Sequence, residues 1–173
     1  MNAKSEVTTG LVRYMRELTM NQVNADEITL APHNMGGITF ALNIHHAEKK
    51  LDVAYAICRP DENFSKDLGR THALAQLEQG AVITIDYEPK APLLNNMIHG
   101  VLNYQPAEAS EAELTKLRTA KQTLMSIINN TEDAIKQFQE LEFMSMLQNA
   151  GQHQHGHCGD EPEGSCCGSC QHD

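Results

Sequence analysis

Short runs of alternating apolar and polar residues predict a sheet in the first part of the chain. The third of these runs shows the pattern best, because Val53, Tyr55 and Ile57 alternate with smaller or polar residues and so share one strand face. A turn at 34–37 separates the first two strands. The predicted strands are 26–32, 38–44, 51–58 and 81–87.

Three segments in the same part of the chain show helical spacing instead. Residues 5–22 carry Leu11, Tyr14, Met15 and Leu18 on one helical face, which predicts a short amphipathic helix. Pro60 is expected to interrupt the sheet and to lead, by way of Asn63, into the second helix. The other predicted helices are 65–79, which Gly80 closes, and a shorter one at 93–104.

The segment 110–149 has the best-marked helix start in the chain. Ser110 and Glu113 form a capping box, and apolar residues then recur at three- and four-residue steps. As a single helix it would be about 60 Å long at about 1.5 Å per residue, too long for one small domain to cover. Either the polar residues 129–131 break it into a hairpin, or it projects and pairs with another subunit. We favour the second alternative, which makes the chain a homo-oligomer.

These patterns define an α+β fold with a small, mostly antiparallel sheet, one inserted helix and a helical C-terminal part from about residue 108. Residues 1–150 form the domain, and they are numerous enough for a hydrophobic core without disulfides. Residues 151–173 are expected to form a separate, disordered tail, because they contain no aliphatic or aromatic side chain to bury.

Charge and composition exclude several functions. The formal net charge is -10, and no dense cluster of lysine and arginine is present, which argues against general nucleic-acid binding. No apolar run is long enough to span a membrane, and the first ten residues lack the apolar core of a secretory signal. We therefore expect a cytoplasmic protein whose cysteines stay reduced and available to metals.

The tail carries the clearest chemical signal in the chain. It holds four of the nine histidines and four of the five cysteines. Thiolates and imidazoles are the ligands that zinc and nickel prefer, so the tail is predicted to hold one of these ions in one or two exchangeable sites. The predicted metal ligands are His153, His155, His157, Cys158, Cys166, Cys167, Cys170 and His172. The alternative is a solvated tail that captures stray metal without a purpose.

In composition, the tail resembles the His/Cys-rich C-terminal tails of bacterial nickel metallochaperones, including those attached to a prolyl isomerase. The resemblance implies metal storage or delivery. It covers residues 151–173 only, and the chain contains no G-x-x-x-x-G-K-[ST] loop of a nucleotide-dependent metallochaperone.

A second motif spans residues 58–70, where a strand passes through a tight loop into a helix. A capped helix start next to basic side chains can hold a phosphate or another small anion. The predicted ligand-binding residues are Arg59, Ser65, Lys66 and Arg70. The simpler alternative is a capped helix with Phe64 in the core and solvated basic residues. A glycine inside this helix, Gly69, indicates close approach of another backbone or of a ligand.

Residues 57–70 read I-C-x-x-D-x-x-F-S-K-x-x-G-R, a pattern that resembles a segment of small phage- and prophage-encoded proteins without an assigned activity. The resemblance implies binding to a host protein, or sequestration of a cyclic nucleotide signal as in the anti-Thoeris and anti-CBASS sponges. For the second role the implied ligand contacts are Arg59, Lys66 and Arg70.

Catalytic patterns are absent from the sequence, so we expect a binding protein and not an enzyme. Cys58 ends an apolar strand and is expected to be a buried thiol without a nucleophilic role, and His45 and His46 are expected to face opposite sides of a strand. The favoured function is a phage-type protein that binds a host factor and carries a metal-binding tail. The two alternatives are a cyclic-nucleotide sponge and a metallochaperone or metal store.

Overall fold

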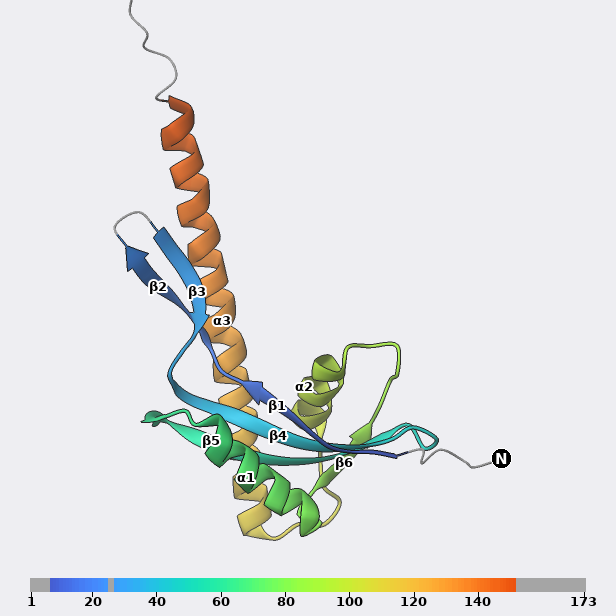
Figure 1. Ribbon diagram of the computed structural model, residues 1–173. Helices are drawn as coiled ribbons and strands as arrows, with labels where there is room; N and C mark the ends of the chain where they lie inside the picture. The colour runs from blue at the N-terminus through green and yellow to red at the C-terminus, as the bar shows by residue number, and fades with distance from the viewer. Residues whose placement is uncertain (1–6, 25–26, 152–173) are drawn as a thin grey trace, which may run out of the picture. The chain divides into compact units, whose positions relative to one another are not determined.

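The computed structural model describes residues 7–24 and 27–151, with the backbone only for the last three of these (Figure 1). The predicted metal ligands of the tail lie outside the described residues. The elements in chain order are β1 (Val7–Met15), β2 (Leu18–Asn24), β3 (Glu27–Pro32), β4 (Met35–His45), β5 (Lys50–Asn63), α1 (Lys66–Glu78), β6 (Ile83–Asp86), α2 (Leu93–Asn103) and α3 (Glu111–Gly151).

Antiparallel strands make up both sheets of the described chain. The larger sheet has the order β1-β4-β5-β6, and β2 pairs with β3 in a separate two-stranded sheet. Every neighbouring pair in the larger sheet is antiparallel. The sheets and the three helices confirm the predicted α+β class.

One face of the larger sheet forms the hydrophobic core. Alternate residues of β4 and β5, such as Phe40, Leu42 and Val53, are fully buried there. Buried residues of α2 and of the first part of α3 complete the same cluster, among them Met97 and Leu124. Burial of these apolar side chains is the main force that joins the helices to the sheet.

Helix α1 packs on β4 and β5, on the face of the sheet opposite the hydrophobic core. This face carries small residues, because Thr39 pairs with Ala56 and Ala41 pairs with Ala54 across the two strands. The helix approaches so closely that a Cβ atom added at Gly69 would overlap the Thr39 hydroxyl. Thr39 therefore accounts for the glycine in the middle of α1, and no ligand is needed to explain it.

The helix predicted at 5–22 is wrong, because this segment forms strands β1 and β2. The apolar residues at helical spacing belong to two strands that meet at Arg16 and Glu17, so the spacing crosses a strand boundary. Leu11 and Met15 pack against the core from β1. Val7, Thr8, Thr9 and Val12 are β-branched and favour the extended conformation.

The expected interruption of the sheet at Pro60 is also wrong, because β5 continues to Asn63. The pairing with β4 shifts register between the pairs Gly37–Cys58 and Met35–Asn63. Pro60 lies in this irregular stretch, where its missing N–H group removes no bond from the regular ladder.

Helix α3 is continuous, so the hairpin alternative at 129–131 is wrong. The polar residues that suggested a break make contacts with the β1–β2 junction: Asn130 donates to Glu17, and the Thr131 hydroxyl accepts from the Leu18 N–H group.

By its internal contacts, the chain divides after Phe138 into two units. In the second unit, Leu141, Phe143, Met144, Met146 and Leu147 are exposed, and pairing of α3 with another subunit remains a prediction.

No helix in the described part of the chain is long and apolar enough to cross a membrane.

The capping box at the start of α3 is confirmed. Glu113 accepts hydrogen bonds from the Ser110 hydroxyl and the Ser110 N–H group, both at 2.7 Å. The Glu113 N–H group donates back to the Ser110 hydroxyl at 3.3 Å. The two bonds from Ser110 lower the pKa of Glu113, and the hydroxyl has the larger effect.

We therefore expect Ser110→Ala to raise the pKa of Glu113 towards the ordinary glutamate value, as measured by NMR titration of the carboxyl carbon. A lowered carboxyl pKa stabilises the fold above the unfolded-state pKa of about 4.3, and that stability is lost as the pH falls through the folded-state value. The stability difference between the native chain and the variant should thus shrink in acid. An unchanged Glu113 titration would contradict the assigned hydrogen bonds.

Candidate functional site

The motif at residues 58–70 forms the corner where β5 leads into α1. Ser65 caps α1, and its hydroxyl accepts from the Leu68 N–H group at 3.3 Å. The N–H groups of Lys66 and Asp67 belong to the first helical turn and have no intrahelical acceptor. The predicted cap is therefore present, with the donors that an anion could use.

The predicted basic residues do not converge on this cap. Arg59 is neutralised by carboxylates of the same strand, β5, since its Nε atom lies 3.4 Å from Asp61 and 3.1 Å from Glu62. Lys66 turns towards β1, with Nζ 5.8 Å from the centre of the Tyr14 ring. Arg70 is exposed, and no ion pair joins it to another described residue. The motif therefore forms a capped helix start, but its basic side chains do not gather positive charge at the cap.

A cleft of about 330 Å³ opens beside the cap, on the side of α1 that faces β5. Of the four predicted ligand-binding residues, only Ser65 lines it. The floor includes the Thr39 hydroxyl, which is 1% exposed and has no hydrogen-bond partner within the described chain. The motif at 58–70 does not predict this arrangement, because Thr39 lies on a different strand, β4. The remaining polar lining comes from Cys58, Glu62, Asn63 and His72.

Cys58 is a half-buried thiol at the wall of this cleft. Its Sγ atom lies 3.5 Å from the Glu62 carbonyl oxygen, to which it can donate. Burial raises the pKa of Cys58, the Gly36 N–H group partly offsets this, and the carboxylates of Glu62 and Asp61 raise it further. The thiol therefore stays protonated at neutral pH, which makes it a poor nucleophile.

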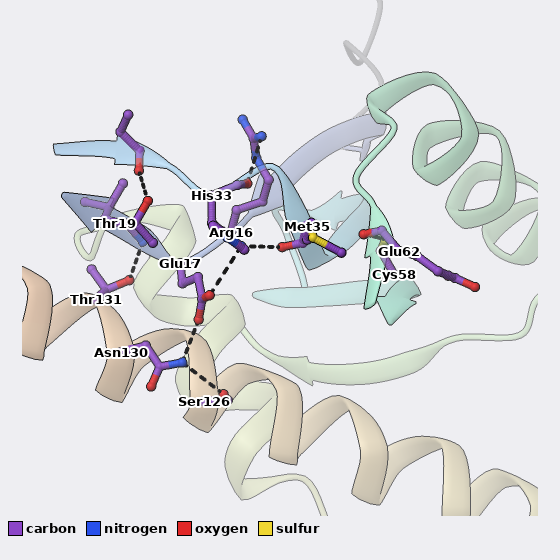
Figure 2. Close-up of polar contacts among 12 residues, drawn as sticks. Arg16, Glu17, Thr19, His33, Met35, Cys58, Glu62, Ser126, Asn130 and Thr131 are labelled. Carbon is purple, nitrogen blue, oxygen red and sulfur yellow. Dashed lines mark hydrogen bonds and ion pairs between the residues drawn. The ribbon is translucent and has the colours of Figure 1, made fainter. Parts of the chain in front are cut away.

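A second polar cluster joins the β1–β2 junction to α3. Glu17 lies at its centre, 3.4 Å from His33 Nδ1 and 2.6 Å from the Asn130 side-chain amide that donates to it (Figure 2). Arg16 donates to the His33 carbonyl oxygen at 3.2 Å. His33 has no partner recognisable in sequence, because Arg16 and Glu17 lie at the β1–β2 junction, far from it along the chain. These polar groups bind one another and hold the elements together.

One lysine that the sequence patterns did not mark is half-buried and has no carboxylate partner among the described residues. Lys116 of α3 donates to the Gln76 side-chain oxygen, and its Nζ atom lies 5.0 Å from the centre of the Tyr55 ring. Burial lowers the pKa of Lys116, while burial and the nearby Tyr104 raise the pKa of Tyr55 to about 12. Both groups line a cleft of about 250 Å³. No sequence pattern marks this site, since Gln76 and Lys116 are forty residues apart.

His45, the last residue of β4, and His46, in the turn that follows, have separate partners. His45 Nε2 lies 2.7 Å from Asp52, whose second oxygen accepts from Thr84 at 2.7 Å. His46 lies 2.9 Å from the Thr8 hydroxyl. Within the described ranges, no three His, Cys, Asp or Glu side chains are placed to hold a metal ion. The body thus contains polar clefts and hydrogen-bonded side-chain pairs that hold its elements together, while the predicted metal ligands belong to residues 151–173.

Comparison with known proteins gives no assignment: no family model, curated protein or solved structure matches the chain.

Proposed function

We propose that this chain is a non-enzymatic binding protein that holds a zinc or nickel ion through residues 151–173. The observation that carries the proposal is the concentration of four histidines and four cysteines in this segment, which has no lysine or arginine. Imidazole and thiolate groups are ligands for both ions, and four of them complete a tetrahedral zinc site. The segment has donors enough for about two such sites.

The proposal of a non-enzymatic body is supported by the state of its reactive side chains. The thiol of Cys58 and the phenol of Tyr55 stay protonated near neutral pH. The carboxylates of Glu17 and Asp52 are already hydrogen-bonded to neighbouring side chains. On this proposal these groups have structural roles, and the clefts bind partners without catalysing a reaction.

Metal binding should depend on the tail donors and on pH. We expect the reduced full-length protein to bind about one or two zinc or nickel ions per chain in isothermal titration calorimetry at pH 7.5. Binding should weaken as the pH falls below about 6.5, because the ligands must be deprotonated. A full-length variant with the tail histidines changed to glutamine and the tail cysteines changed to serine should show no binding heat.

The matched control is Cys58→Ser, which removes the only cysteine outside the tail and should leave the titration unchanged. Loss of binding in Cys58→Ser, or undiminished binding in the tail variant, would place the metal elsewhere and refute the proposal.

A further inference from the structure

Strand β6 forms an outer edge of the larger sheet. Its register with β5 fixes which main-chain groups point outward. The Tyr87 N–H group donates to the Lys49 carbonyl oxygen at 2.8 Å, and the ladder continues through the pairs Leu51–Ile85 and Val53–Ile83. In an antiparallel ladder the residues between bonded pairs turn their N–H and C=O groups away from the partner strand. Thr84 and Asp86 therefore present theirs on the outer edge.

At Glu88, the next residue whose main-chain groups point outward, both groups are already hydrogen-bonded to a side-chain amide. The Asn96 side chain of α2 accepts from the Glu88 N–H group at 2.8 Å and donates to the Glu88 carbonyl oxygen at 3.0 Å. These are the two bonds that a peptide group of an added strand would make. The same side chain also donates to the carbonyl oxygens of Ala91 and Pro92. Asn96 thus ends the open part of the edge and leaves the outward groups of Thr84 and Asp86 available.

A cleft of about 580 Å³ lies along this open edge, between β6 and α2. Helix α2 packs tightly against β6 at this point, since a Cβ atom added at Gly100 would overlap the Ile85 side chain. On the helix side, Asn95, His99 and Asn103 line the cleft at steps of four residues, so they form one row along α2. All three are exposed within the described chain.

We propose that this cleft binds an extended polypeptide segment of a partner protein, which adds a fifth strand beside β6. Main-chain hydrogen bonds to Thr84 and Asp86 would supply affinity for any extended segment. The row on α2 would supply specificity by contacting the side chains of that segment. The row consists of two amides and an imidazole. The charges of Lys50 and Asp86, which also line the cleft, neutralise each other in an ion pair at 2.6 Å. The segment that fits carries uncharged polar residues at every second position. Its binding does not require metal in the tail.

The test uses a random heptapeptide library displayed on phage and selected on the immobilised full-length protein. Selected peptides are synthesised, and their binding is measured by fluorescence anisotropy. Thr84→Pro removes an outward N–H group without removing a bond to β5, as proline is tolerated at such edge positions. We expect it to weaken peptide binding by at least about tenfold, because a main-chain bond is lost and the ring obstructs the edge.

The matched control is Thr84→Ala, which loses the same hydroxyl bond to Asp52 but keeps the N–H group; it should bind as the native chain does. A second variant, His99→Trp, fills the cleft from an exposed helix position and should also abolish binding, so the test does not depend on the folding of Thr84→Pro.

The proposal is overturned if no peptide is selected, or if the selected peptides bind His99→Trp as they bind the native chain. It is also overturned if Thr84→Pro is folded by circular dichroism and binds as Thr84→Ala does. If the native chain is a dimer that Thr84→Pro converts to a monomer, the edge pairs with a second copy and the proposed partner is wrong.

Discussion

Replacing Leu124 with alanine is expected to lower the free energy of unfolding by about 2–5 kcal/mol, the usual cost of emptying a leucine site in a core. Leu124 is fully buried in the cluster that joins α3 to the sheet. The loss combines the transfer free energy of the removed groups with the cavity they leave. Urea denaturation of the full-length protein, followed by circular dichroism, measures it.

The matched control is Leu147→Ala, on the same helix. Leu147 is 53% exposed, so its replacement should change the stability by no more than about 0.5 kcal/mol. A cost of no more than about 0.5 kcal/mol for Leu124→Ala as well would show that the first part of α3 does not contribute to the core as described. A large effect at Leu147 alone would show that the second unit is covered in solution, as the predicted self-association requires.

Gly37→Ala is the second substitution with a large expected effect. Gly37 has a φ angle of 143°, and an added Cβ atom would lie 2.8 Å from the Met15 carbonyl oxygen and 2.8 Å from the Phe64 ring. The backbone oxygen cannot move without disturbing the pairing of β1 with β4. Backbone strain and overpacking together should cost roughly 2–5 kcal/mol, measured by thermal unfolding.

Gly80→Ala separates the two causes of that loss. Gly80 also has a positive φ angle, 70°, but nothing lies within 4 Å of an added Cβ atom. Only the conformational cost of about 1–2 kcal/mol is expected there. If Gly37→Ala were no more costly than Gly80→Ala, the close contact of Gly37 with Met15 and Phe64 would be refuted.

Local patterns predicted the elements whose signals were confined to one segment. The capping box located the start of α3, and Gly80 marked the end of α1, because both signals act within one helical turn. The patterns failed at 5–22, where Tyr14 and Leu18 have helical spacing but lie on different strands. Spacing alone cannot show that a strand ends between two apolar residues.

The candidate sites were harder to predict, because their residues come from separate elements. The motif at 58–70 correctly indicated a capped helix, whereas the orientation of Lys66 towards Tyr14 depends on the neighbouring strand. The contact of Lys116 with Gln76 depends on how α3 lies against α1. The open edge of β6 follows from the strand order, which the sequence patterns do not specify.

The proposed metal site is tested most directly by titrating the reduced full-length protein with Co²⁺ as a spectroscopic substitute for zinc. Coordination by thiolates produces charge-transfer absorption that histidine or carboxylate ligands alone do not give. We predict that this absorption appears at neutral pH, saturates, is displaced by Zn²⁺, and is absent when Cys158, Cys166, Cys167 and Cys170 are all changed to serine. No such absorption in the native chain, or the same absorption in the serine variant, would contradict metal binding by the tail.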